Sequence, residues 1–381
     1  MNYGILFTGQ GSQFPSMAKE LIENYSAAEE TFKKADEILG YSVSDICTKA
    51  ELFDKMNFTK YAQPAIFTLE YAIFSVLKGF LKNNEYMPNF MAGHSLGEYT
   101  ALAAGEAISF EEALKLIDKR GKYMSESADK EKSTMIAVTG ASEDIQSIID
   151  EYVQKRDSIF VACENSDTQT VYSVKESEKN NFISFVEKIG ARAKNLSVEG
   201  GFHSCFMSLA KEKLKSELEN YNFNCPCCCV YSNTKGNIYE SADEIKDMLP
   251  KHLTDCVKWK SIINKIKAEK PDFLLEIGPT PVLSKELQKT AGKDKILHIG
   301  PMCNMKEISE EIENKINIGY ENDVKKIVRT LVCSKSDGKE ETLKNRERAY
   351  DYLVNMIRSG NINAGKLVEA KNIYQKLTAV L

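Results

Sequence analysis

Short apolar runs alternate with longer amphipathic stretches along most of the chain. The runs at residues 3–8 and 90–92 are too short for helices, and each leads into a glycine-containing turn, so they predict buried strands. Apolar residues at helical spacing predict helices around them, at residues 16–39, 61–82, 97–105 and 110–126. This alternation of strand and helix indicates an α/β fold.

The pattern changes between residues 134 and 198. Here strands and helices are predicted in the order β-α-β-β-α-β, at residues 135–139, 142–155, 159–164, 170–174, 177–189 and 191–198. This order is typical of a ferredoxin-like unit. Because the α/β pattern resumes after it, we expect a small domain inserted into a larger one.

The predicted domains follow from these changes of pattern. Residues 1–133 and 199–304 are expected to form the main domain, with predicted elements at residues 209–220, 229–233, 242–253, 259–267, 273–277, 283–289 and 296–299. Residues 134–198 form the insertion. Residues 305–381 are charged and carry three amphipathic faces, which predict a helical extension.

Composition and charge exclude several classes of protein. Hydrophobic residues make up 43% and charged residues 28% of 381 residues, as in ordinary globular proteins. The net charge of −5 gives no reason to expect nucleic acid as a partner, and no run approaches the length of a membrane span. The start of the chain is typical of a core strand and not of a signal peptide, so a cytoplasmic location is expected.

Ten cysteines are present, and four of them gather at residues 225–229. A disulfide framework is not expected in a chain of this length without a secretion signal. A zinc site would need a second pair of cysteine or histidine ligands with suitable spacing, and the sequence has no such pair, so no metal is expected. Alternation instead predicts a buried strand, with Cys227 and Cys229 on one face and Cys228 on the other.

The stretch Gly93-His94-Ser95-Leu96-Gly97 has the form of a nucleophile elbow. The preceding apolar run predicts a strand, and the following residues predict a helix. A sharp turn between them would expose Ser95, and the helix N-terminus would direct N–H groups at an oxyanion. The glycine-rich turn at residues 8–13 is expected to bring Gln10 close to the elbow.

A serine nucleophile needs a base, and the chain has four histidines. His94 flanks the nucleophile, His252 lies on a charged helical pattern, and His298 lies in the last predicted strand. His203 follows Gly200 and Gly201 where the chain re-enters the main domain. It is therefore the best candidate base, with a purely structural role as the alternative.

Several motifs in order resemble the malonyl-CoA:acyl carrier protein transacylase family, which includes polyketide synthase acyltransferases. The resemblance covers about residues 1–300 and rests on the elbow and on six further motifs, at residues 7–13, 59–65, 120–124, 202–204, 232–233 and 276–279. It implies an α/β-hydrolase-like domain with a ferredoxin-like insertion.

The resemblance also implies roles for individual residues. Ser95 would be the acyl nucleophile and His203 its base, and Leu96 N–H and Gln10 would form the oxyanion hole. The malonyl pocket would contain Arg120, Gln63 and Phe202. A planar guanidinium suits a carboxylate, although an isolated helical arginine is more often a surface residue. Phe202 before the base implies a preference for malonyl over methylmalonyl.

The segment before Trp259 departs from the family pattern. It has Asp255-Cys256-Val257-Lys258 where Asn-Pro-Val-Gln is common. In this family a backbone carbonyl there orients the histidine. A carboxylate of Asp255 approaching His203 is the alternative.

These observations predict transfer of malonyl from malonyl-CoA to the phosphopantetheine thiol of an acyl carrier protein, without metal or bound cofactor. Two other functions remain open. One is a hydrolase of acyl carrier protein thioesters, which would not need Arg120. The other is a non-catalytic docking domain, which would not need Ser95, His203 or Gln10.

Overall fold

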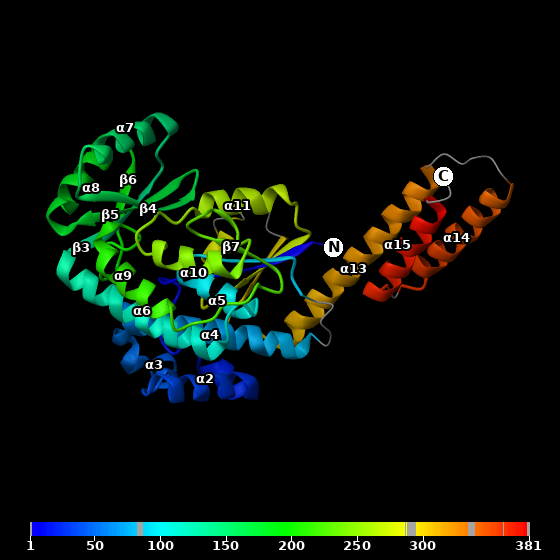
Figure 1. The fold of residues 1–381 in the computed structure, drawn as a ribbon, viewed down its shortest axis with the longest axis horizontal. Coiled ribbons are helices and arrows are strands. Elements are labelled where there is room, and N and C mark those ends of the chain that lie inside the picture. The colour runs from blue at the N-terminus through cyan, green and yellow to red at the C-terminus, as the bar shows by residue number, and fades with distance from the viewer. Residues whose placement is uncertain are drawn as a thin grey trace. The chain divides into compact units, whose positions relative to one another are not determined.

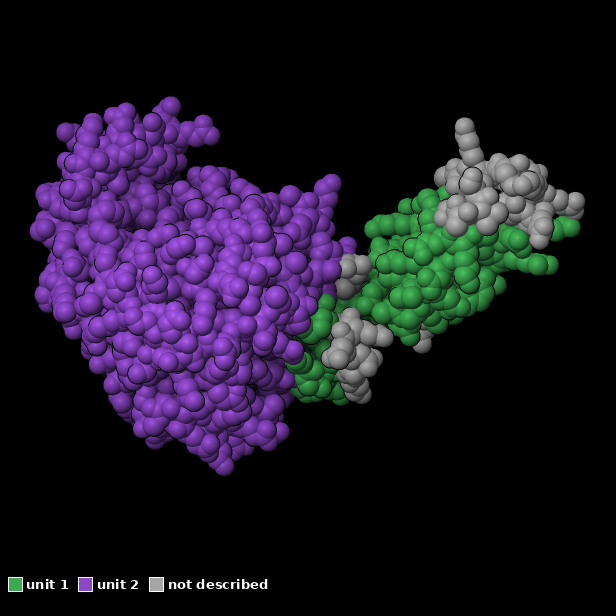
Figure 2. Space-filling view, in the orientation of Figure 1, with its two compact units in different colours: residues 1, 77–87, 304–381 green, residues 2–76, 88–303 purple. Residues whose placement is uncertain are grey.

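The computed structural model describes residues 2–81, 87–285, 287, 295–333, 340–360 and 362–378. The chain forms two compact units (Figure 2). The larger consists of residues 2–76 and 88–303, and the smaller of residues 1, 77–87 and 304–381. The predicted helix at residues 283–289 lies partly outside the described residues.

A six-stranded sheet forms the centre of the larger unit (Figure 1), in the order β10-β9-β1-β2-β7-β8. Its strands are β1 Tyr3–Phe7, β2 Phe90–Gly93, β7 Cys229–Ser232, β8 Asn237–Ile238, β9 Phe273–Ile277 and β10 Ile296–Ile299. All neighbours are parallel except β7 and β8. Every residue of β1, β2 and β9 is buried, as in parallel sheets covered on both faces. The α/β fold predicted from the sequence is confirmed.

Helices surround this sheet. They are α1 Lys19–Asn24, α2 Ser26–Leu39, α3 Val43–Thr48, η1 Ala50–Asn57, α4 Thr59–Phe80, α5 Leu96–Ala104, α6 Phe110–Glu131, η4 Cys205–Met207, α9 Ser208–Leu218, α10 Ala242–Lys251 and α11 Trp259–Ala268. The single helix predicted at residues 16–39 is wrong, because extended backbone at Tyr25 (φ −135°, ψ 112°) separates α1 from α2. The pattern also missed α3 and η1, which are short.

A second sheet of four antiparallel strands lies in the same unit, in the order β4-β5-β3-β6. Its elements are β3 Ser133–Thr139, α7 Glu143–Gln154, β4 Ile159–Ser166, β5 Gln169–Lys175, η3 Glu176–Glu178, α8 Lys179–Lys188 and β6 Arg192–Asn195. Ile149 of α7 and Phe182 of α8 share one core cluster with Ile136 and Tyr172 of the strands, so both helices cover the same face (Figure 1). The β-α-β-β-α-β order is the one read from the sequence.

Glu70 of α4 joins three elements inside the larger unit. Its carboxylate accepts hydrogen bonds from the hydroxyls of Thr8, after β1, at 2.6 Å and of Thr100, in α5, at 2.7 Å. The side chain is fully buried, and this burial raises the Glu70 pKa to about 8.

The cysteine cluster does not form the buried strand that alternation predicts. Cys225, Cys227 and Cys229 are exposed, and β7 begins only at Cys229. The buried positions of β7 are Val230 to Ser232. The cysteines before them belong to the connection that follows α9, where no neighbouring strand requires alternation.

The smaller unit contains three helices of the C-terminal region: α13 Met305–Cys333, α14 Glu340–Arg358 and α15 Ala364–Thr378. Their apolar faces form one core cluster, with Val324, Leu353, Met356, Leu367 and Ala370 among its buried members. None of the helices in the described part of the chain has the length and apolar character needed to cross a membrane.

The first prediction concerns this helical cluster. Leu353 is 0% exposed, so Leu353→Ala should remove packing worth about 2–5 kcal/mol from the free energy of unfolding of the smaller unit. The acyl transfer rate should stay within about twofold of the parent, because the residues of the candidate site lie in the larger unit. Val368→Ala, at a 56% exposed position of α15, is the matched control. A large loss of transfer in a folded Leu353→Ala variant would contradict this separation.

Candidate active site

Ser95 occupies a strained turn between β2 and α5. Its backbone has φ 51° and ψ −104°, a conformation that non-glycine residues rarely adopt. Close approach of the backbone explains the flanking glycines: a Cβ at Gly93 would lie 1.9 Å from the Gly97 carbonyl carbon, and one at Gly97 would lie 2.3 Å from the Thr8 oxygen. The predicted elbow is therefore present as a sharp strand-to-helix turn.

Asn233, which follows β7, holds this turn from the side. Its Oδ1 accepts a hydrogen bond from the Ser95 N–H at 2.7 Å, and its Nδ2 donates to the Gly93 carbonyl at 2.7 Å. The side chain thus bonds both the residue before the turn and the nucleophile itself. The sequence motif included Asn233, but no role could be given to it, because the contact spans 138 residues.

His203 is correctly placed to act as a base for Ser95. Its Nε2 lies 2.8 Å from Ser95 Oγ, and its Nδ1 lies 2.8 Å from the His252 carbonyl oxygen. Because a carbonyl can only accept, Nδ1 carries the proton, and Nε2 is left to accept from the serine hydroxyl. His203 also has a positive φ of 57°, so both members of the pair sit on strained backbone.

The electrostatic surroundings keep His203 neutral. Burial, and then the positive charge of Arg120, lower the His203 pKa to about 3. A neutral imidazole at ordinary pH is the form that can accept a proton.

The carbonyl that orients His203 belongs to His252, at the end of α10, and not to the 255–258 segment considered from the sequence. The Asp255 carboxylate instead accepts from Thr254 Oγ1 at 2.9 Å. His252 itself is fully buried, although it lies on a charged helical pattern. Leu249 and Leu253 beside it are also buried, so this end of α10 packs into the core.

The residues expected to form an oxyanion hole lie beside Ser95. Leu96 is the first residue of α5, so its N–H has no acceptor within the helix. Gln10 follows β1, whose C-terminal end lies next to that of β2 in the parallel sheet. Both residues line the same cavity as Ser95. The Gln10 side-chain Oε1 accepts from Thr59 Oγ1 at 2.8 Å, which fixes this side chain.

Arg120 is buried beside Ser95, and is not the surface residue that an isolated helical arginine more often is. It is 1% exposed, its Nη1 donates to Gln63 Oε1 at 2.5 Å, and its Nη2 lies 3.5 Å from Ser95 Oγ. The guanidinium carbon lies 5.1 Å from the centre of the Tyr99 ring. Nε has no hydrogen-bond partner among the described residues. The partners named here are all uncharged, which leaves the cation able to bind an anion.

A hydrogen-bond chain that the sequence did not reveal supports Arg120 and Gln10. Gln63 Nε2 donates to Thr59 Oγ1 at 2.9 Å, and Thr59 Oγ1 donates to Gln10. Glu199, just before the Gly200-Gly201 turn, accepts the Thr59 N–H at 2.5 Å. No local sequence pattern identifies Glu199, because its bond crosses 140 positions.

Ser95 and His203 line one cavity of about 390 Å³, between the two sheets of the larger unit. It includes all the predicted site residues except Gln63, which contacts Arg120 behind it. Its lining includes Gln10, Ser95, Leu96, Arg120, Phe202 and His203. Serine, imidazole, N–H donors and a buried guanidinium are together suited to acyl transfer involving an acidic acyl group.

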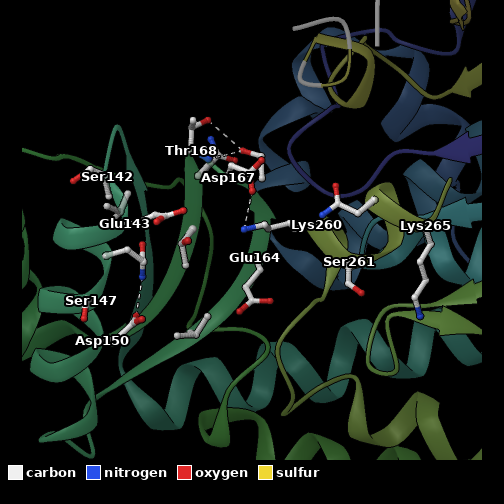
Figure 3. A pocket seen from close by; sticks show the side chains of 18 of the residues that line it. Ser142, Glu143, Ser147, Asp150, Glu164, Asp167, Thr168, Lys260, Ser261 and Lys265 are labelled. Atoms are coloured by element: carbon white, nitrogen blue, oxygen red, sulfur yellow. Dashed lines mark hydrogen bonds and ion pairs between the residues drawn. The ribbon is translucent and has the colours of Figure 1, made fainter. Parts of the chain in front are cut away.

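A larger cavity, of about 860 Å³, does not contain Ser95. Figure 3 shows its polar walls, with Asp150 on one side and Lys265 on the other. Lys260 of α11 bonds Asp167 at 2.7 Å across the top of this cavity. Its lining consists largely of charged and polar side chains, so the size of a cavity alone does not locate the active site.

Comparison with known proteins agrees with this geometry. The sequence model of the acyl transferase domain family matches residues 5–333. The chain belongs to this family.

Three family relatives are similar over most of this chain. A malonyl CoA-acyl carrier protein transacylase of Bacillus subtilis strain 168 is 36% identical over 286 residues, covering 74% of this chain and 89% of the relative. The structure of a protein with the same name from Clostridium perfringens superposes with TM-score 0.76 at 30% identity, covering 84% of this chain and all of the other. A transacylase in complex with a type II polyketide synthase acyl carrier protein gives TM-score 0.75 at 28% identity, covering 82% and 100%.

The second prediction tests the Asn233 contact. Asn233→Ala leaves the Ser95 N–H and the Gly93 carbonyl without these partners, so the strained turn should relax. Reaction of Ser95 with a fluorophosphonate probe should become about 10- to 100-fold slower, as expected when a reacting group is misplaced. Asn264→Ala, at an exposed asparagine of α11, is the control. Equal labelling rates for Asn233→Ala and the control would show that the turn holds itself.

Proposed function

We propose that this protein transfers a malonyl group from malonyl-CoA to the phosphopantetheine thiol of an acyl carrier protein. It is then an [acyl-carrier-protein] S-malonyltransferase of fatty acid or polyketide synthesis. The observation that carries the proposal is the buried Arg120 guanidinium in the cavity of Ser95 and His203. Membership of the acyl transferase family and the names of its relatives support the same reaction.

In the first half-reaction, His203 Nε2 takes the proton of Ser95 Oγ as the oxygen attacks the malonyl thioester carbonyl carbon. The tetrahedral oxyanion is stabilised by the N–H groups of Leu96 and Gln10. When the carbon–sulfur bond breaks, the CoA sulfur receives the proton from His203. The product is a malonyl ester of Ser95.

The second half-reaction repeats these steps with another thiol. His203 Nε2 accepts the proton of the phosphopantetheine thiol, whose sulfur attacks the ester carbonyl. Ser95 Oγ leaves and recovers the proton from His203. Because the nucleophile, base and N–H donors serve both directions, transfer is of the ping-pong type.

Arg120 selects the acyl group in this proposal. A guanidinium presents paired N–H donors to a carboxylate, and for a buried side chain such as Arg120 this charge-assisted contact is strong. Gln63 holds one side of the guanidinium, which leaves the other for the malonyl carboxylate. Phe202 also lines the cavity, and its preference for malonyl over methylmalonyl remains a prediction.

The proposal also covers cofactors, partners and location. Serine, imidazole and N–H donors are sufficient for each step, so no metal or bound cofactor is invoked. Malonyl-CoA and an acyl carrier protein are the proposed partners, with neither nucleic acid nor membrane among them. The cytoplasmic location expected from the sequence stays a prediction.

We also propose the finer fold description made from the sequence. The six-stranded sheet with its elbow is assigned to an α/β-hydrolase-like domain of residues 1–133 and 199–304. The β4-β5-β3-β6 sheet, with two helices on one face, supports a ferredoxin-like insertion at residues 134–198. Residues 305–381 are the helical extension.

The hydrolase alternative shares Ser95 and His203 but gives no reason to bury Arg120 against the nucleophile. A docking domain gives no reason for the 2.8 Å contact between Ser95 Oγ and His203 Nε2. Both alternatives are therefore less well supported by the site.

The third prediction tests Arg120 directly. Arg120→Ala leaves the malonyl carboxylate buried without a partner, at a cost of about 2–5 kcal/mol, or roughly 30- to 5000-fold in kcat/KM for malonyl transfer. Acetyl transfer should fall far less, because acetyl has no carboxylate. Arg120→Lys should rescue poorly, since an ammonium cannot replace the guanidinium fork.

The measurement is the malonyl-to-acetyl ratio of kcat/KM for these variants and the parent. Arg156→Ala is the matched control, because it removes an arginine that stacks on Tyr152 of α7, outside the cavity of Ser95. An unchanged ratio in Arg120→Ala would remove the reason for malonyl and place the hydrolase alternative first.

A further inference from the structure

The His252 side chain is a buried polar group for which the reaction above has no use. It is 0% exposed, and neither ring nitrogen has a hydrogen-bond partner among the described residues. Its ring lies beside that of His203, with the ring centres 4.9 Å apart and the planes 33° from parallel. His252 therefore contacts the base twice, through its carbonyl and through its ring.

A buried carboxylate lies close to Nδ1 of this ring. Glu98 is in the first turn of α5, three residues after Ser95, and its side chain is 1% exposed. Its Oε2 is 3.4 Å from His252 Nδ1 and accepts the Asn233 N–H at 3.2 Å, and its Oε1 accepts from the Tyr239 hydroxyl. The order Glu98, His252, His203, Ser95 thus runs continuously through the core.

Two opposite influences act on the charge of Glu98. Burial raises its pKa to about 7, while the bonds from Tyr239 and Asn233 and the charge of Arg120 act in the lowering direction. Burial, with smaller contributions from His203, Arg120 and His94, lowers the His252 pKa well below its usual value. Glu98 is therefore the member of this pair that changes charge near neutral pH.

The catalytic step creates a positive charge that this site otherwise opposes. His203 becomes an imidazolium as it takes the Ser95 proton, in a buried position near the permanent cation Arg120. His94, on the elbow, is half-buried, and desolvation lowers its pKa. Tyr99 and Tyr239 are neutral, because burial raises both pKa values. Among these groups, Glu98 alone can supply a negative charge.

We propose that the Glu98 carboxylate, acting across the His252 ring, stabilises the imidazolium that His203 forms during acylation. Both are positioning residues, since neither touches the reacting atoms. In a serine–histidine–aspartate triad, the carboxylate both orients the histidine and stabilises its positive charge. Here the His252 carbonyl orients His203, and Glu98 with the His252 ring stabilises the charge. This inference rests on the proposed function, because it concerns acylation of Ser95.

The inference has a defined pH dependence. Below the Glu98 pKa the carboxyl is neutral, so the stabilisation is absent and acylation is slow. As pH rises through about 7, Glu98 ionises and acylation should become faster. His203 does not produce this rise, because its lowered pKa keeps it neutral throughout the range.

The experiment is single-turnover acylation of Ser95 by malonyl-CoA between pH 5.5 and 9, which involves no attacking thiol. Glu98→Gln keeps an acceptor for Tyr239 but cannot ionise. It should match the parent at the acid end, lack the rise near pH 7, and be about 10- to 100-fold slower at pH 8.5, as expected for one charge one ring away.

Glu70→Gln is the matched control. Glu70 is equally buried with a raised pKa, but it bonds Thr8 and Thr100 and not His252. The rise of its acylation rate with pH should be that of the parent. A parent-like rise in Glu98→Gln would overturn the inference, whereas a parent that forms no acyl-enzyme would overturn the proposed function.

Histidine-selective ¹⁵N NMR of the parent tests the same pair without a Glu98 variant. With only four histidines in the chain, the His252 signals can be identified by their loss in His252→Gln. They should show a proton on Nδ1 and shift with an apparent pKa of about 7, as Glu98 ionises. Signals that do not move between pH 6 and 8 would contradict the pairing.

Discussion

The strained backbone at Ser95 is the constraint on which the rest of the site depends. A φ of 51° holds the hydroxyl out of the turn between β2 and α5 and within 2.8 Å of His203 Nε2. This conformation is not self-supporting, because an unstrained turn is always available to a serine. An unstrained turn is excluded by its surroundings. These are the parallel strands β1 and β2, the close backbone packing at the two elbow glycines, and the bonds from the Asn233 side chain.

The same packing buries the side chains of His203 and Arg120, and this burial determines the electrostatics of the site. Burial keeps His203 neutral, and Arg120 reinforces this because two neighbouring cations are unfavourable. In the proposed reaction, the malonyl carboxylate cancels the charge of Arg120 when it binds. Protonation of His203 then becomes easier only when the correct substrate is present. Glu98, which contacts His252, would assist the same protonation.

Those parts of the structure that depend on residues close together in the sequence were predictable. The elbow, its strand and helix, and the order of elements at residues 133–195 follow from local patterns. His203 could be chosen because few histidines are present and glycines precede it. The break at Tyr25 was missed because the apolar spacing continues across it.

The supporting contacts of the site could not be predicted in this way. Asn233, Glu199 and His252 meet their partners only after folding brings distant segments together. The charged pattern around His252 did not indicate that this end of α10 is buried, or that the His252 carbonyl oxygen contacts His203. An isolated helical arginine is more often a surface residue, so residue type alone did not indicate that Arg120 is buried. The structure buries it on the same face of α6 as Ile117 and Met124.

In the proposed reaction, Ser95 carries the malonyl group between two thiols. Intact-protein mass spectrometry after brief mixing with malonyl-CoA detects this acyl-enzyme. We expect one malonyl group on the parent, located on Ser95 and discharged by a holo acyl carrier protein. Ser95→Ala should gain none, and His203→Ala should be labelled about 10²–10⁴-fold more slowly. Labelling of Ser95→Ala to the extent of the parent, or a parent adduct that only water removes, would contradict the account.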